Sequence, residues 1–504
     1  MIQPTVRGAL AVLLVTAACT TEGDPSRPGA TYAEVPCPGM VTAQILLETS
    51  CGYLTVPETR GDAESRMIRL LVTRVTPPGA RVGGEPMLVV GTDLAAATGY
   101  GGVAPMAERI GREVIMLDAR GTGLSQPRLD CPEVDEVADV VLAAPSSDDR
   151  ARELFLEAVG GCHRRLAEGG VDVSAYNVEA MAADADDLRR ALGIEAWGVT
   201  ALGTTSRIAL EMMRRDRGHI SEVVLDAPEF PQNDPVAEAG RWTEAAIDEL
   251  AAACAADRRC DARFPTPRSR VRDVLDQVQA GPVPATVDVG TEELEVLLDG
   301  SRYLLALRHL LSVIGHRLSP DGVVGLVAAI SEGPVGPVEL LASLEPNALT
   351  GPAHCFGYLP RCDAAEVSMG VHYSLVCHDA LRSPELQPAS GHPYAVALAE
   401  GPHDEVCGRW PMEAADPSMA SAVRSDIPTL VLGGRFDPFA PPEILREGAA
   451  LLSRSWVATS SDHGHNVLGA SECLREIRNA WVENPTRAPS QPACATDGGV
   501  DFSG

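Results

Sequence analysis

The 504-residue chain contains no lysine, so all 41 of its basic residues are arginine, and 70 acidic residues outnumber them to give a net charge of −29. This deficit of positive charge argues against nucleic acid or an anionic membrane surface as a partner. The sequence also lacks a C-x-x-C pair, which argues against the common zinc and dithiol motifs. We therefore expect no metal and no cofactor. The apolar content of 45% is enough to bury a large core, with or without a sizeable insertion.

No hydrophobic run near the start of the chain is long enough to span a bilayer. Arg7 precedes an uncharged stretch, residues 8–18, which has the length of the hydrophobic region of a secretory signal peptide. The residues up to Cys19 are similar to a bacterial lipobox. We predict a signal peptide over 1–18, a lipid anchor on Cys19 and a tether over 19–35. The protein would then be exported and held at the cell surface by the lipid alone, with simple secretion as the alternative.

The cysteine count supports export. Of thirteen cysteines, twelve remain once Cys19 carries the lipid, and twelve can form six disulfides in an oxidising compartment. The alternative is a set of free buried thiols in a cytosolic protein. Sequence alone does not determine connectivity, but spacing favours local pairs. These are Cys37–Cys51, Cys131–Cys162, Cys254–Cys260, Cys355–Cys362, Cys377–Cys407 and Cys473–Cys494.

Strand-like and helix-like segments alternate along much of the chain, which predicts an α/β fold with a parallel sheet covered on both faces. From about residue 232 to 425 the pattern becomes mainly helical, as in the run Trp242 to Ala256 and in a stripe of leucines after residue 303. A final helix is expected at about Glu472 to Val482. The strands are expected near 51–57, 68–75, 86–90, 113–118, 197–202, 221–226, 427–434 and 455–458.

One stretch has the organisation of a nucleophile elbow. A helix over 186–194 precedes a strand that begins at Trp197, then a turn of small residues, then the start of another helix at Ile208. In α/β-hydrolases this strand–turn–helix unit carries the serine of G-x-S-x-G. Here the central position is Gly203, so the scaffold of the motif is present without its attacking oxygen.

Four segments carry a resemblance to a known family. Residues 118–125 match D-x-R-G-x-G-x-S, and residues 430–442 end in G-x-x-D-P-x-x-P-P; segments 186–210 and 221–228 are similar as well. On these residues the chain resembles the prolyl and tripeptidyl (TAP-like) aminopeptidases, serine peptidases of exported actinobacterial proteins. The resemblance covers Cys37 to Cys494. It implies an α/β-hydrolase fold with a core over 36–231 and 426–485, a helical lid over 232–425, and a tail over 486–504 tied back through Cys494.

The same resemblance implies the roles of the site residues. Asp437 matches the family's catalytic acid and His465 its base, which gives the chain order nucleophile position, Asp, His. The oxyanion region falls at Thr92, Asp93 and Thr204. The family has a glycine-rich turn at the first two of these positions, and a carboxylate at Asp93 has the wrong sign for stabilising a developing negative charge.

These substitutions predict a protein without peptidase activity. Loss of a triad nucleophile costs about 10⁶ in rate, and loss of an oxyanion donor a further factor of roughly 10²–10³. We expect a non-catalytic protein that binds a peptide, a cell-envelope fragment or a partner. One alternative is an active peptidase or esterase in which Thr204, Thr205 or Ser206 replaces the missing nucleophile. A second is a metal site formed by Asp437, His463 and His465.

Overall fold

A computed structural model describes residues 29–39, 41, 45, 47–80, 84–91, 93–216, 218–235, 237–289, 292–315, 320–344, 368–380, 394, 398 and 403–489. The predicted signal peptide, Cys19 and most of the predicted tether lie outside these residues. So do Cys355, Cys362, Cys494 and Thr92.

The described residues form one nine-stranded sheet in the order β1-β2-β3-β5-β4-β6-β7-β10-β11. The pairs β1–β2, β2–β3 and β3–β5 are antiparallel. The pairs β4–β5, β4–β6, β6–β7, β7–β10 and β10–β11 are all parallel. The bounds are β1 Thr31–Val35, β2 Glu48–Pro57, β3 Met67–Thr76, β4 Met87–Gly91, β5 Val114–Asp118, β6 Trp197–Leu202, β7 Ile220–Asp226, β10 Thr429–Gly434 and β11 Ser455–Ser460.

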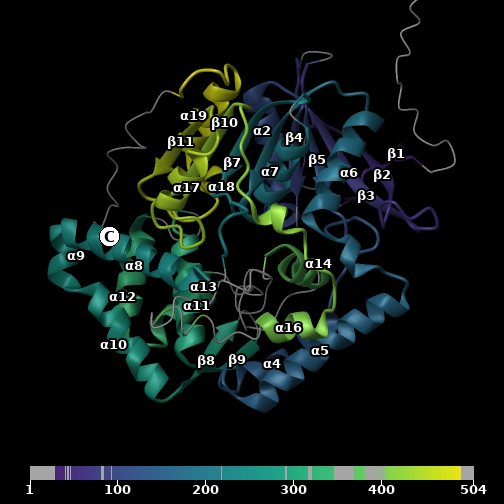
Figure 1. Cartoon of the computed structure of the whole chain (residues 1–504). Coiled ribbons are helices and arrows are strands. Elements are labelled where there is room, and N and C mark those ends of the chain that lie inside the picture. The colour runs from purple at the N-terminus through teal and green to yellow at the C-terminus, as the bar shows by residue number, and fades with distance from the viewer. Residues whose placement is uncertain are drawn as a thin grey trace, which may run out of the picture.

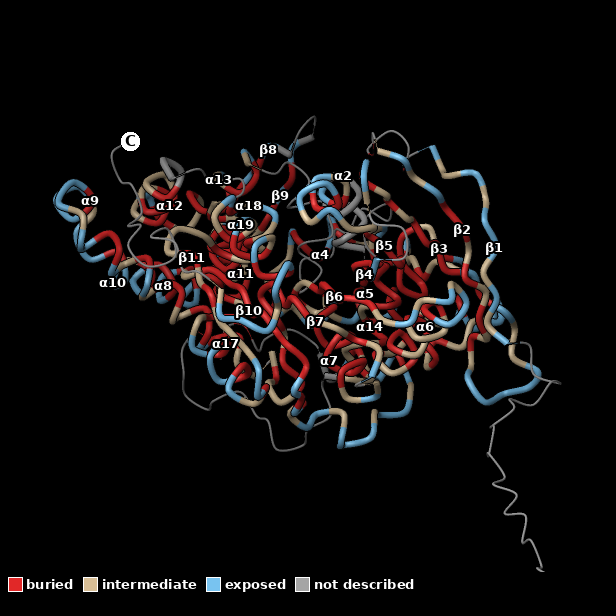
Figure 2. Tube along the Cα trace, turned by 90° about the horizontal axis from the view of Figure 1, so that it is seen from above, coloured by how far each residue is buried: buried red, intermediate tan, exposed pale blue. Residues whose placement is uncertain are grey.

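Strand β1 corrects the predicted tether. The predicted tether over 19–35 includes residues 31–35, but these pair along their whole length with β2 at the edge of the sheet. The segment is mostly exposed, as Figure 2 shows, and it has no run of apolar residues that would predict a strand. Its structure comes from backbone pairing with a neighbouring strand, which a local pattern does not reveal. Any tether therefore ends before Thr31.

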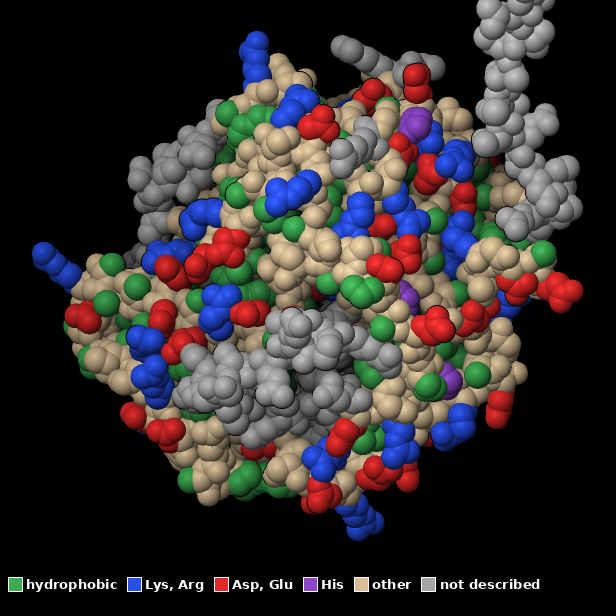
Figure 3. All heavy atoms as spheres, in the orientation of Figure 1, with side chains coloured by type: hydrophobic (Ala, Val, Ile, Leu, Met, Phe, Trp, Pro, Cys, Tyr) green, Lys and Arg blue, Asp and Glu red, His purple; other side chains and the backbone are tan. Residues whose placement is uncertain are grey.

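Helices cover both faces of the sheet, as the alternating pattern predicts (Figure 1). One face packs against α2 Asp93–Ile110 and α19 Glu472–Val482. The other packs against α6 Val178–Ala191, α7 Ser206–Arg215 and α17 Pro442–Ala449. The central strands are almost entirely buried. On the face seen in Figure 3, arginine side chains lie among acidic ones and do not gather in one basic patch.

The first part of the predicted lid, from α8 to α13, contributes most of a second hydrophobic core beside the sheet, whereas Met369, Val371 and Trp410 of the same segment pack in the core of the sheet. In Figure 1 the lid segment occupies the lower part of the molecule, below the sheet and its covering helices. The predicted run at Trp242 to Ala256 lies in α8, and the leucine stripe lies in α11. The bounds are α8 Ala239–Ala256, α9 Arg258–Arg263, α10 Pro267–Ala280, α11 Gly300–Ser312, α12 Pro320–Glu332 and α13 Gly336–Leu344.

The lid is not wholly helical. Residues Val283–Val289 (β8) and Glu292–Leu298 (β9) form an antiparallel hairpin that the sequence pattern did not indicate. Pro284 in one strand and the glutamates of the other weaken the strand signal. The hairpin is stabilised by its apolar face, since Val287, Leu294 and Val296 are buried in the lid core.

Further helices pack beside these two cores, and α5 and α16 each carry one cysteine of a disulfide. They include α3 Pro132–Glu136, α4 Ala138–Leu142, α5 Asp149–Glu168, α14 Met369–Leu375 and α16 His403–Arg409. Within the described residues, four predicted pairs are bonded: Cys37–Cys51, Cys131–Cys162, Cys254–Cys260 and Cys377–Cys407. Cys473 is also disulfide-bonded. Disulfides persist in oxidising compartments, so this chain belongs to an extracellular environment.

Among the described residues, no helix combines the length and the apolar character needed to cross a membrane.

Candidate functional site

The candidate site lies at the carboxyl ends of four neighbouring parallel strands. Gly203 follows β6 directly, Glu229 lies three residues beyond β7, Asp437 three beyond β10, and His465 five beyond β11. Parallel strands present their carboxyl ends at one edge of the sheet, where ligands of open α/β sheets bind. The structure therefore brings Gly203, Asp437 and His465 together from segments that are far apart in the chain.

Gly203 forms the sharp turn between β6 and α7. Its φ of +51° lies in the left-handed region that glycine adopts without strain. A Cβ built on this residue would lie 3.2 Å from Nε2 of His465 and 3.7 Å from Cε1. A side chain at position 203 would thus point at the Nε2 edge of the imidazole, as the nucleophile of a hydrolase does.

Asp437 orients the ring of His465. Its Oδ2 lies 2.9 Å from Nδ1 of His465, and its Oδ1 accepts hydrogen bonds from the backbone N–H groups of Phe439 at 2.8 Å and Ala440 at 3.1 Å. The Asp437 side chain is fully buried, whereas 18% of the His465 side chain is exposed. Burial of the ring favours neutral imidazole, but the Asp437 carboxylate outweighs it, so the pKa of His465 lies above its usual range.

The backbone of the His465 loop is held by the lid. The N–H of His465 donates to the carbonyl of Ser312 at 2.8 Å, and the N–H of Gly464 donates to Ile314 at 2.9 Å. A Cβ on Gly464 would lie only 2.1 Å from the carbonyl oxygen of Leu311, so this close approach requires glycine. The end of α11 and the histidine loop therefore form one backbone-bonded unit.

The hydroxyl groups that follow Gly203 have structural partners. The Thr205 hydroxyl donates to the carbonyl of Leu202 and accepts from its N–H, both at 2.9 Å. The Ser206 hydroxyl donates to the carbonyl of Gly203 and accepts from the N–H of Glu229 at 2.8 Å. These bonds stabilise the elbow. Thr204, between Gly203 and Thr205 in the chain, is partly buried.

Most side chains of the predicted oxyanion loop are not among those that the structure describes. Strand β4 ends at Gly91 and helix α2 begins at Asp93, so a single residue, Thr92, separates them. The side chain of Asp93 is not among those described, and its predicted effect on charge at the site stays a prediction.

Asp226, at the end of β7, is a buried group whose role the sequence did not predict. Its two oxygens accept hydrogen bonds from the N–H groups of Val467 at 3.1 Å and Leu468 at 2.8 Å, just beyond His465. Burial raises the pKa of Asp226 to about 6. The sequence held one indication, because Asp226 lies in segment 221–228, which resembles the aminopeptidase family.

The metal alternative has no support in the geometry of the described residues. Nδ1 of His463 lies 2.6 Å from Asp462 and 2.7 Å from the Ser460 hydroxyl, so it is bonded away from Asp437. Among the residues that the structure describes, no group of three or more His, Cys, Asp or Glu side chains is arranged to hold a metal ion.

Arg308 and Phe439 also belong to the site, although sequence reasoning missed both. Arg308 comes from lid helix α11, and its guanidinium carbon lies 4.2 Å from the centroid of the Phe439 ring. The Phe439 ring in turn packs edge-on against His465, with centroids 5.3 Å apart. The only sequence signal was an arginine inside the leucine stripe of the lid.

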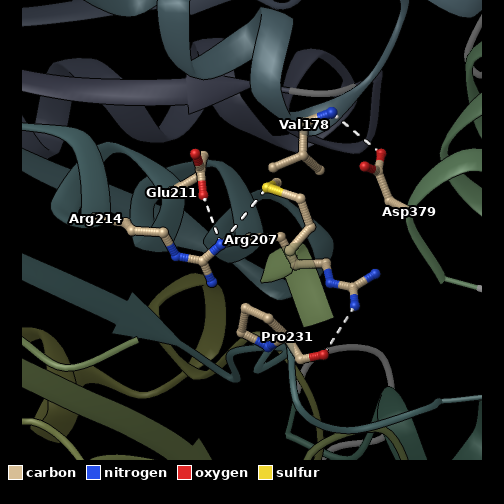
Figure 4. Close-up of a pocket in the computed structure, with 7 residues that line it drawn as sticks. Val178, Arg207, Glu211, Arg214, Pro231 and Asp379 are labelled. Carbon is tan, nitrogen blue, oxygen red and sulfur yellow. Dashed lines mark hydrogen bonds and ion pairs between the residues drawn. The ribbon is translucent and has the colours of Figure 1, made fainter. Parts of the chain in front are cut away.

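A separate small cavity lies near the start of α7 (Figure 4). Its charged groups bond to neighbouring atoms: Arg214 pairs with Glu211, Arg207 donates to the Pro231 carbonyl at 3.4 Å, and Asp379 accepts from the N–H of Val178 at 3.1 Å. Its charged side chains therefore hold neighbouring segments of the chain together.

The sheet order and the placement of the site at the carboxyl ends of its strands define an α/β-hydrolase fold, which confirms the predicted fold class. Residues 395–494, which contain both Asp437 and His465, match the family model described as TAP-like protein. Comparison with curated protein sequences gives no match.

Solved structures similar to the chain include a proline iminopeptidase from Mycobacterium smegmatis, with 16% identity over 86% of this chain and 98% of that one and a TM-score of 0.41. An esterase from Thermogutta terrifontis shows 14% identity over 86% and 99%, with a TM-score of 0.36. The protein Rv0554 from Mycobacterium tuberculosis shows 15% over 86% and 97%, with a TM-score of 0.37.

Proposed function

We propose that this protein is a non-catalytic relative of the TAP-like aminopeptidases that binds a peptide or cell-envelope ligand at the carboxyl edge of its sheet. The observation that carries the proposal is the position of Gly203. The residue lies where a nucleophile would face Nε2 of His465, and it has no side chain. Without that oxygen the triad loses a factor of about 10⁶ in rate.

Retention of the Asp437–His465 pair is compatible with a non-catalytic role. Asp437 is fully buried and hydrogen-bonded on both oxygens. Removing His465 would leave a buried acceptor without its partner, at a cost of about 1–3 kcal/mol or more. The pair can therefore persist for stability alone.

The competing function is an active peptidase or esterase with a displaced nucleophile. Thr205 and Ser206 are disfavoured because their hydroxyls are bonded to backbone groups of the elbow. Thr204 is the strongest candidate of the three, since it is adjacent to Gly203 and only partly buried.

A fluorophosphonate probe separates the two functions. We expect no labelling of the wild-type protein or of Gly203→Ala, which adds the Cβ without an oxygen, and measurable labelling of Gly203→Ser. A peptide-arylamide assay on the same three proteins should show no turnover by the first two. Labelling of wild-type protein that is lost in Thr204→Val would instead establish the displaced nucleophile.

The proposed location is the outer cell surface, with Cys19 as the lipid-bearing residue. The disulfides support an oxidising compartment. Cys19→Ala should release the protein from the membrane fraction into the medium or periplasm. An unchanged membrane fraction would contradict the lipid anchor and leave the binding function untouched.

A further inference from the structure

Arg308 is a buried arginine that makes no hydrogen bond or ion pair with any residue the structure describes. The residue is 8% exposed, and its Nε atom is buried without a partner. Its guanidinium lies against the ring of Phe439. Burial lowers the pKa of Arg308 to about 10, which still leaves the group charged at neutral pH.

Two other buried arginines donate several hydrogen bonds each, although the Nε of Arg302 is itself buried without a partner. Arg302, on the same helix, donates to the carbonyls of Val141 at 2.7 Å, Leu142 at 2.9 Å and Leu297 at 2.5 Å. Arg120 donates to both oxygens of Asp184 at 2.7 Å. A buried charge without such partners carries a desolvation penalty of several kcal/mol. The contrast with Arg302 indicates that Arg308 serves something other than the stability of the lid.

The two carboxylates that act on Arg308 are already engaged. Asp437 and Glu229 both attract its charge. Asp437 is bonded to His465, however, and Glu229 forms an ion pair with Arg207 at 3.3 Å. The guanidinium therefore contributes positive charge beside the His465 ring, on the lid side of the candidate site.

We propose that Arg308 binds a carboxylate of the ligand held over Gly203 and His465. A planar guanidinium with several donors suits a carboxylate, which can accept two parallel hydrogen bonds from it. The inference rests on the proposed binding function and narrows its ligand to a peptide with a free carboxyl terminus or another carboxylate-bearing fragment.

Isothermal titration calorimetry with N-acetyl-Ala-Ala, its carboxyl-terminal amide and acetate tests this assignment. We expect wild-type protein to bind the acid at least tenfold more tightly than the amide, and Arg308→Met to lose that preference. Binding of acetate as tight as that of the acid would identify a small free carboxylate as sufficient. Equal affinity for acid and amide, or no heat from any of the three probes at millimolar concentration, overturns the assignment.

Unfolding measurements without ligand supply an independent readout. Because an unpaired buried charge is costly, Arg308→Met should raise the denaturation midpoint, whereas Arg302→Met, which breaks three hydrogen bonds, should lower it. A lowered midpoint in both variants would make Arg308 structural and overturn the proposal. Fluorophosphonate labelling of wild-type protein would overturn the non-catalytic function, yet the comparison of acid with amide would still decide the role of Arg308.

Discussion

The N–H of His465 donates a hydrogen bond to the carbonyl of Ser312 at 2.8 Å, which joins the loop of the predicted catalytic base to the lid. Gly464, the preceding residue, lies so close to α11 that a Cβ there would be 2.1 Å from the Leu311 carbonyl. The lid is therefore part of what positions His465. It cannot be treated as a cover that moves independently of the imidazole.

This contact predicts a large effect of Gly464→Ala. The added methyl group must push apart two backbone segments, which should lower the free energy of unfolding by about 1–3 kcal/mol or more. Urea denaturation measures the change. Gly408→Ala is the matched control, because a Cβ there meets nothing within 4 Å, and the substitution should stabilise α16 slightly. Equal midpoints for the two variants would contradict the close packing of the histidine loop on the lid.

Gly203→Ala should destabilise the protein by more than its backbone strain alone. A non-glycine residue in the left-handed region costs about 1–2 kcal/mol, and the new Cβ also lies 3.2 Å from His465. Gly111→Ala isolates the strain, since Gly111 has a similar φ of +63° and no atom within 4 Å of its Cβ position. Differential scanning calorimetry should show a larger loss at position 203. A smaller loss there than at Gly111 would mean that the imidazole lies elsewhere.

Asp437→Asn should lower the pKa of His465, because the carboxylate that favours the charged ring is removed. The folded-state pKa of His465 is raised, so the pair stabilises the fold fully below the unfolded pKa and loses this contribution as pH rises through the folded value. Nuclear magnetic resonance titration of the ring protons measures the shift. Asp462→Asn, which removes the partner of His463, should leave His465 unchanged. An unaltered His465 pKa in Asp437→Asn would contradict the 2.9 Å contact.

Asp226 should make the protein less stable as pH rises from 4 to 7. Its folded-state pKa of about 6, against a usual 3.8, means that the folded state holds a proton that the unfolded state releases. Between pH 4 and 7, the unfolding free energy of wild type should therefore fall by about 3 kcal/mol relative to that of Asp226→Asn. Denaturation at several pH values measures it. A difference that stays constant with pH would show that Asp226 is ionised throughout.

Several parts of this protein could be predicted from the sequence because they are local. Short apolar runs located eight of the nine strands in the described sheet, and the order of the cysteines matched the four described disulfides. The turn at Gly203 was recognisable from the strand before it and the helix after it. Such features depend on neighbouring residues, whose spacing is visible in the chain itself.

Tertiary structure decided the rest. Strand β1 exists because β2 offers it backbone partners, and Asp226 supports the loop of His465 across about 240 residues of sequence. In the sequence, Arg308 is one polar residue within a mainly apolar helix. In the structure, the packing of that helix against the sheet places its guanidinium over the ring of Phe439. The sequence by itself predicts that Gly203 occupies the nucleophile position. Only the packing of α11 against the sheet places the Arg308 charge beside the site, because that contact joins segments with no local pattern in common.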